Sequence, residues 1–327
     1  MTTPLYSVSI SARATLNMHS LNNEGGEGNQ IQTRMVNIID QRGELQNVNA
    51  ISGDMFKHIQ AGHLFHIARE DSSLPLCIGC REFNANRINA DIEFMSRAAD
   101  LSDTAFIDKL LSYCTLDDIE GVLITEGKRS LPRKSVIEFG WVVGLPGRVE
   151  TDSYFHVKYA PRDRTKTAQQ RQAEEQSGSY IGQAIFHRPA SSGIYAAVCH
   201  LEMARIGFND ISQEYAISDE QRERRARALL ESVLYTFMQP DGAMRSAQAP
   251  HLVDFSGVLS YSTAPVPAPT VSPLKDEYDQ QIFAIQSALE SIVPGKVGIV
   301  PFASLGEFAG IVGDLLSSGT PYKLLYR

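Results

Sequence analysis

The chain has 327 residues, of which 43% are hydrophobic and 21% charged, with a formal net charge of −8. This composition is typical of a globular protein with a full core, and the net acidity argues against a protein that coats nucleic acid non-specifically. No apolar run approaches the roughly 18–20 residues of a transmembrane helix, and the first residues do not form a signal peptide. We therefore expect a cytoplasmic protein of one large or two medium domains, whose four cysteines stay reduced.

Residues 5–17 alternate between apolar and polar side chains, which predicts a half-buried β-strand. The apolar positions of this strand are Val8, Ile10, Ala12, Ala14 and Leu16. A polar, glycine-rich segment follows and ends near Asn29. Its backbone N–H groups and amide side chains could bind anions, and asparagine and histidine beside glycine suit unpaired nucleic acid.

A helix from about 53 to 68 is expected next, after short extended pieces at 35–39 and 45–50. Ser52 would cap this helix, because its hydroxyl can accept a hydrogen bond from the first turn. Residues 85–127 are helix-like and acidic, and they interrupt the strand pattern as an insertion. An acidic face of this kind repels the phosphates of an RNA backbone.

Strand patterns return at 136–145 and 154–159, and again at 183–187 and 194–206. Between them, residues 160–179 contain almost no large apolar side chain. Two strands on either side of a long polar tip predict a protruding hairpin, and loops of this length are usually functional or disordered.

The C-terminal third alternates helices and strands. Ser218 and Gln221 form a capping box, and the apolar spacing predicts a helix from there to about 238. A strand at 252–261 and a stiff proline-rich linker at 263–273 follow. The expected elements after the linker are a helix at 276–292, a strand at 297–301 and a helix at 304–317.

Three motifs resemble the DevR family, whose members are backbone subunits of type I CRISPR Cascade complexes. The first runs Ser11-Ala-Arg-x-Thr-Leu-Asn-x-His-Ser-Leu-Asn-Asn-Glu-Gly-x-Glu-Gly-Asn29. The second is Ile51-Ser-Gly-Asp-Met-Phe-Lys-His58, and the third is Gly242-Ala-Met-Arg-Ser-Ala-Gln-Ala-Pro-His251. The likeness runs along most of the chain and is sharpest between Ser9 and His66.

This resemblance implies an α+β fold, a modified ferredoxin-like (RRM-type) palm with inserted helical fingers and a β-hairpin thumb. The palm would comprise residues 1–66, 136–150, 193–262 and 295–327. The fingers would be 67–135, the thumb 151–192, and the proline-rich linker with its helix 263–294.

The resemblance also implies a non-catalytic, cofactor-free scaffold that polymerises head-to-tail along a guide RNA (crRNA) in an antiviral ribonucleoprotein. Its partners would be further copies of itself, other Cascade subunits and target DNA paired with the guide. The candidate RNA-binding residues are Asn17, His19, Asn22, Asn23, Arg34, Lys57, His58, Arg162, Arg164, Lys166, Arg245 and Ser246.

Two other basic clusters and the glycine at 242 leave alternatives open. The cluster at 127–134 fits either an RNA groove or a simple charged turn. Four arginines near the start of the helix at 218–238 favour an exposed face with i,i+4 ion pairs; they are Arg222, Arg224, Arg225 and Arg227. The segment at 242–246 fits a helix-ending turn, a phosphate clamp, or both.

The pairs His63-x-x-His66 and Cys77-x-x-Cys80 have ligand types and spacings that suit tetrahedral Zn²⁺, although core packing explains them equally well. Cys114 and Cys199 show no partner pattern.

The sequence contains no nucleophile elbow, Walker loop, dinucleotide fingerprint or His-Glu-x-x-His motif. In related type III subunits an early-loop aspartate cleaves RNA, but this loop offers only Glu24 and Glu27, and the next aspartate is Asp40. The nuclease activity is therefore not carried over to this chain. The two alternatives to the scaffold function are a metal-dependent ribonuclease of the same fold and a DNA-binding transcriptional autoregulator.

Overall fold

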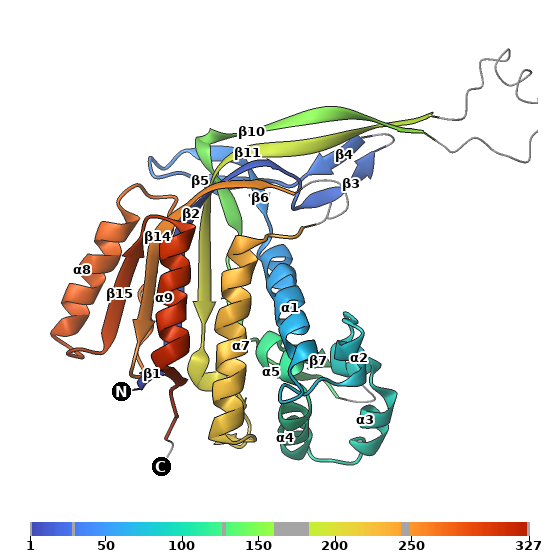
Figure 1. Cartoon of the computed structure of the whole chain (residues 1–327), viewed down its shortest axis with the longest axis vertical. Coiled ribbons are helices and arrows are strands. Elements are labelled where there is room, and N and C mark those ends of the chain that lie inside the picture. Colours follow the sequence, from blue (N-terminus) through green and yellow to red (C-terminus); the bar gives the residue numbers. More distant parts are fainter. Residues whose placement is uncertain (1, 28–29, 126–128, 160–182, 243–248, 326–327) are drawn as a thin grey trace, which may run out of the picture.

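The computed structural model describes residues 2–27, 30–125, 129–159, 183–242 and 249–325, and it has a mixed α+β fold (Figure 1). Its central sheet is mainly antiparallel, in the order β15-β14-β2-β11-β10-β6-β5. These strands are β2 (Ser7–His19), β5 (Met35–Ile39), β6 (Leu45–Ile51), β10 (Val142–Tyr159), β11 (Gln183–Leu201), β14 (His251–Ser262) and β15 (Val297–Phe302). The α+β class expected from the sequence is confirmed.

Strand β2 lies at the centre of the sheet, between β14 and β11, and both of its faces are covered. Its predicted apolar positions are buried, but Ser7, Ser9 and Ser11 on the opposite face are only 1% exposed. The reason is the proline-rich segment at 263–273, which lies against this second face. There the Ser9 hydroxyl donates to the Ala268 carbonyl. The prediction of a half-buried strand was therefore wrong for this end of β2.

Helices α1 (Gly53–Glu70), α7 (Asp219–Met238) and α9 (Leu305–Ser318) lie side by side against the main core (Figure 1). Phe237 of α7 stacks on Phe255 of β14 at 4.6 Å, and Phe308 of α9 meets Phe255 edge-on at 5.2 Å. The serine caps predicted for α1 and α7 are both confirmed, because the Ser52 and Ser218 hydroxyls accept from backbone N–H groups of the first turn. On the other face of the sheet, α8 (Tyr278–Glu290) packs against β14.

Strands β10 and β11 form one long hairpin, whose paired ends project beyond the helices in Figure 1. β11 joins the two strands predicted at 183–187 and 194–206, and β10 joins the strand predicted at 154–159 to the second part of the one predicted at 136–145. The expected strand at 194–206 ends earlier, at Leu201, and the 3₁₀ helix η2 (Met203–Arg205) follows. Residues 160–182 lie outside the described residues. Within the described part of the chain, no helix is long and apolar enough to cross a membrane.

A helical insertion packs beside α1, at the lower end of the molecule in Figure 1. It contains α2 (Ile78–Arg81), η1 (Arg87–Ala90), α3 (Ile92–Arg97), α4 (Asp103–Tyr113) and α5 (Thr115–Glu120), with the short strands β7 (Val122–Ile124) and β8 (Leu131–Arg133). Asp91, Asp117, Asp118 and Glu120 are all buried. The prediction of an acidic outer face is therefore wrong for these four residues.

A buried ionic network joins the insertion to α7. The Asp118 carboxylate lies 2.7 Å from the Arg133 guanidinium and 2.7 Å from that of Arg225. Arg222 is buried as well and donates to the Ile206 carbonyl. The predicted exposed face was thus wrong for Arg222 and Arg225, and neither reading of the 127–134 cluster anticipated the burial of Arg133. Arg224 does form the expected surface pair with Glu220.

The remaining strands are short and lie at the margins of the molecule. β1 (Thr3–Leu5) pairs with β16 (Gly319–Pro321), and β12 (Phe208–Asn209) pairs with β13 (Glu214–Tyr215). β9 (Ile137–Phe139) pairs with β11, while β3 (Asn23–Glu27) and β4 (Gln30–Thr33) form a hairpin after β2.

Candidate nucleic-acid interface

Segments far apart in the sequence meet at the end of β2, at the upper end of the molecule in Figure 1. The Asn22 side-chain oxygen accepts a hydrogen bond of 2.8 Å from the backbone N–H of Ser52, the cap of α1. Gly242, just after α7, packs so closely on Leu21 that a Cβ there would lie 2.5 Å from the Leu21 Cα. The end of β2, the start of α1 and the segment after α7 therefore form one surface.

His19 and Asn22 hold this surface together from the inside. They are only 2% and 5% exposed. The His19 ring packs edge-on against Tyr195 at 4.9 Å, and the Asn22 backbone carbonyl accepts from the backbone N–H of Arg34 while its side-chain oxygen accepts from Ser52. In this conformation both side chains position the loop, and neither is available to contact a ligand directly.

Arg34 and Trp141 form a cation–aromatic pair beside this loop. The Arg34 guanidinium carbon lies 5.7 Å from the centre of the Trp141 ring, and Trp141 remains 43% exposed. An indole face and a guanidinium can bind a base and a phosphate respectively. Sequence reasoning selected Arg34 but missed Trp141. The available signal was that this is the only tryptophan of the chain.

Side chains at the end of β2 connect this surface to exposed aromatic rings on the β10–β11 hairpin. Asn17 of β2 is half-buried and pairs in register with His251 of β14. Met18 has φ of 55°, and its sulfur lies 3.7 Å from the Tyr154 hydroxyl. Tyr154 and its neighbour Phe155 are 39% and 58% exposed on β10. Aromatic rings left open in this way can stack with the bases of a single strand.

Lys57 and His58 lie on different sides of α1. His58 lines a groove of about 670 Å³ that also includes Phe83, His66 and Gly242. The Lys57 ammonium instead donates to the Glu120 carbonyl at 2.9 Å. Burial lowers the pKa of Lys57 from its usual value. The resemblance implied that both residues bind RNA, but of the two only His58 lines the groove that reaches Gly242.

The family model described as CRISPR-associated negative auto-regulator DevR/Csa2 matches residues 10–282. The chain belongs to this family. The protein of Methanocaldococcus jannaschii described as CRISPR-associated protein Cas7/Cst2/DevR is 26% identical over 270 residues, which cover 79% of this chain and 82% of that protein. The resemblance to the DevR family seen in the sequence is thereby confirmed.

Solved structures also resemble this DevR-family chain. A chain of a "CRISPR RNA-guided surveillance complex, pre-nicking" has a TM-score of 0.48 at 12% identity, covering 94% of this chain and 99% of that chain. Csc2 of Thermofilum pendens has a TM-score of 0.41 at 10% identity, covering 96% and 86%.

Some candidate residues of this DevR-family member lie outside the described residues. These are Arg162, Arg164 and Lys166 of the polar tip, and Arg245 and Ser246 after Gly242. Asn23 is described through its backbone, which begins β3. The RNA-binding roles of these residues stay predictions.

The zinc quartet of two histidines and two cysteines is not formed. His63 and His66 line the groove beside α1, and the His63 Nε2 atom lies 3.0 Å from the Gln239 carbonyl. Cys77 and Cys80 instead lie together with Cys114 and Asp117. The zinc reading of the two histidines was wrong, and the sequence pattern did not indicate that Cys114 lies beside Cys77 and Cys80.

Replacing His19 with phenylalanine should make the free energy of unfolding less sensitive to acid. Burial lowers the pKa of His19 to about 4, whereas the unfolded chain has a value near 6.5. The unfolded state therefore binds the proton more readily than the folded state. The contribution of neutral His19 to the free energy of unfolding is fully present above about pH 6.5 and is lost as the pH falls towards 4. The loss should reach about 3 kcal/mol.

The measurement is urea unfolding of wild type and His19→Phe at several pH values, and the ring in the variant can still pack on Tyr195. Taking the difference is necessary because burial raises the pKa of Glu120 to about 7, which acts in the opposite direction. The same substitution at exposed His251 is the control. Equal pH slopes for wild type and His19→Phe would contradict the expectation.

Proposed function

We propose that this DevR-family chain is a non-catalytic guide-RNA-binding backbone subunit of a CRISPR surveillance complex. The observation that carries the proposal is the surface at the end of β2, where the three resemblance motifs meet around Leu21 and Asn22. Beside it lie the Arg34–Trp141 pair and the exposed rings of the β10–β11 hairpin. A guanidinium with open aromatic faces suits a single strand, whose phosphates and bases are both accessible.

The strand order supports a ferredoxin-like palm in this proposal. Strands β14-β2-β11-β10 are neighbours, with α1 following β2 and α7 following β11. This is the connectivity of a β-α-β-β-α-β unit. The palm would thus comprise 1–66, 136–150, 193–262 and 295–327. The insertion at 67–135 would be the fingers, the hairpin at 151–192 the thumb, and 263–294 the linker with its helix.

Several copies would bind one RNA head-to-tail, since a repeated interface that does not close generates a helical filament. Arg34, Asn17 and His58 would contact the RNA, together with Arg245 and Ser246. The basic residues of the thumb tip would reach the neighbouring copy; these are Arg162, Arg164 and Lys166. The protein would read backbone and shape, and the guide would read the target DNA by base pairing.

The structure argues against the ribonuclease alternative, because Asp40, the aspartate nearest to the early loop, holds a turn together. The Asp40 carboxylate accepts from the backbone N–H groups of Arg42 and Glu44, within the turn between β5 and β6. The autoregulator alternative keeps one supporting observation, which is the wording of the matching family's description. Binding measured in parallel to single-stranded RNA and to duplex DNA separates the proposed backbone subunit from the autoregulator.

The test is RNA co-purification, followed by binding measurements on the stripped protein. Wild type should carry RNA from cells that express a guide locus. Trp141→Ala should lower the affinity for single-stranded RNA by about 5–150-fold, as expected for about 1–3 kcal/mol of base stacking. Arg34→Ala should lower it for all RNA sequences and reduce the salt slope by about one unit.

Arg224→Ala is the matched control, because Arg224 is an exposed arginine of α7 whose partner is Glu220. Wild type that purifies without RNA, or an Arg34→Ala defect that depends on the bases present, would refute the proposed contact.

A further inference from the structure

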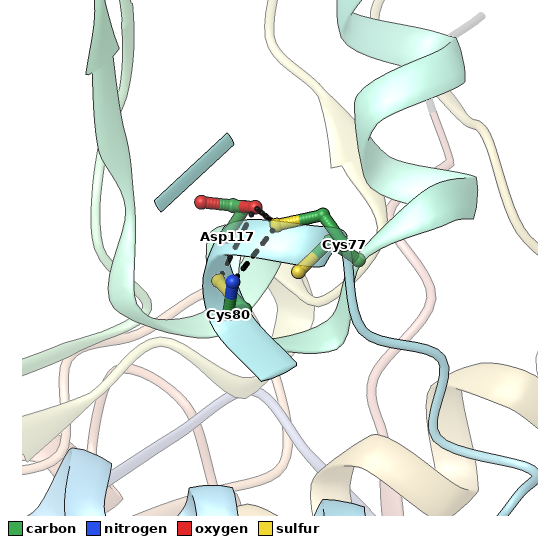
Figure 2. Close-up of side chains that lie close together, drawn as sticks. Cys77, Cys80 and Asp117 are labelled. Atoms are coloured by element: carbon green, nitrogen blue, oxygen red, sulfur yellow. Dashed lines mark hydrogen bonds between the residues drawn. The ribbon is translucent and has the colours of Figure 1, made fainter. Parts of the chain in front are cut away.

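Three cysteines and an aspartate meet inside the helical insertion. The Sγ atoms of Cys77, Cys80 and Cys114 and a carboxylate oxygen of Asp117 all lie within 4.8 Å of one another. All four residues are buried, with exposed fractions of 0–1%. Figure 2 shows Cys77, Cys80 and Asp117 pointing towards one another. Such a concentration of groups that can carry negative charge is unfavourable in a core unless a cation or protons neutralise it.

The four groups lie at the starts of two short helices, α2 and α5. Cys77 caps the N-terminus of α2 and Cys80 lies within it. Cys114 is the residue between α4 and α5, and Asp117 lies in the first turn of α5. Each pair has two intervening residues, and helical geometry brings such positions to one side. Within each pair the spacing is that of C-x₂-C…C-x₂-C zinc sites, with aspartate as the last ligand, although the interval from Cys80 to Cys114 is longer than the roughly 15–20 residues of that pattern.

The distances fit a tetrahedral ion. Asp117 Oδ2 lies 3.3 Å from Cys77 Sγ and 3.6 Å from Cys80 Sγ. With Zn–S near 2.3 Å and Zn–O near 2.0 Å, tetrahedral angles put sulfur and oxygen ligands about 3.5 Å apart. The backbone N–H of Cys80 donates to Cys77 Sγ at 3.3 Å, and that of Ile88 donates to Asp117 Oδ1 at 3.4 Å. Hydrogen bonds of this kind orient the ligands of metal sites.

We propose that Cys77, Cys80, Cys114 and Asp117 bind one structural Zn²⁺ ion. Thiolates select zinc over magnesium or calcium, which prefer oxygen ligands. Four protein ligands in a buried site leave no open position for a substrate, so the role is structural. The ion would tie α2 to the junction of α4 and α5. It would also brace α1, because the carbonyl of Glu120 at the end of α5 accepts the Lys57 ammonium.

The test begins with the metal content of the full-length protein, purified from zinc-supplemented cells without chelator. We expect about one zinc per chain by elemental mass spectrometry, and close to zero for Cys77→Ser and Cys114→Ser. Asp117→Asn should bind more weakly and lose its zinc to a mild chelator that leaves wild type loaded. Cys199→Ser is the matched control, since Cys199 is another buried free cysteine but lies in β11. It should keep a full equivalent of zinc.

Wild type alone provides a second measurement if the cysteine variants fail to fold. Replacing zinc with Co²⁺ should give the absorption of a tetrahedral cobalt–thiolate centre. Zinc should also protect three thiols from alkylation, and a chelator should expose them. Wild type without stoichiometric zinc, a Cys77→Ser variant that folds and keeps its zinc, or a disulfide found among these cysteines would each overturn the proposal.

Discussion

Replacing Asp118 with alanine should lower the free energy of unfolding by about 3–5 kcal/mol, as for other buried ion pairs that lose one partner. Asp118, Arg133 and Arg225 are almost fully buried, and the carboxylate lies 2.7 Å from each guanidinium. It also accepts from the backbone N–H of Gly207. Alanine would leave two guanidinium groups in the core without this counter-charge. Urea unfolding monitored by circular dichroism measures the change.

Glu220→Ala is the control for this substitution. It also removes an acidic partner from an arginine, but the pair with Arg224 is exposed at the start of α7. Its effect should stay within about 0.5 kcal/mol. Asp118→Asn should fall between the two, because the amide oxygen can still accept from Gly207. If Asp118→Ala were as mild as Glu220→Ala, the network would not contribute to stability as described.

The helix starts could be predicted from the sequence because they depend on neighbouring residues. The hydroxyls of Ser52 and Ser218 each accept from an N–H group three residues ahead. The arginines of α7 could not be assigned in this way. Local spacing suggested surface pairs, but Arg225 meets Asp118, which is distant in the sequence. Charge patterns give no indication of such long-range partners.

In the candidate site, too, local features could be predicted from the sequence, whereas long-range contacts could not. Its segments were selected from the sequence, and the structure adds how they meet, through the Asn22–Ser52 hydrogen bond and the contact of Gly242 with Leu21. The proposed metal site was sought among histidines and cysteines. Asp117 was therefore overlooked, although Cys114 and Asp117 repeat the spacing of Cys77 and Cys80.

Replacing Gly242 with alanine should both destabilise the protein and weaken RNA binding. With the present backbone, the new Cβ would lie 2.5 Å from the Leu21 Cα and 2.7 Å from the Leu21 carbonyl oxygen. These are backbone atoms and cannot rotate away, so the segment after α7 must move off the end of β2. Overpacking of this kind costs about 1–3 kcal/mol. Under the proposed function, the displaced segment carries Arg245 away from the RNA.

Gly313→Ala in α9 is the matched control, because a Cβ there meets nothing within 4 Å. Alanine favours helix over glycine by about 1 kcal/mol, so this variant should be as stable as wild type or more so. Urea unfolding and titration of labelled single-stranded RNA should be run on wild type and both variants. A Gly242→Ala protein that is destabilised but binds RNA normally would exclude the segment after α7 from the interface. Unchanged stability would mean that Gly242 and Leu21 do not pack as closely as the geometry requires.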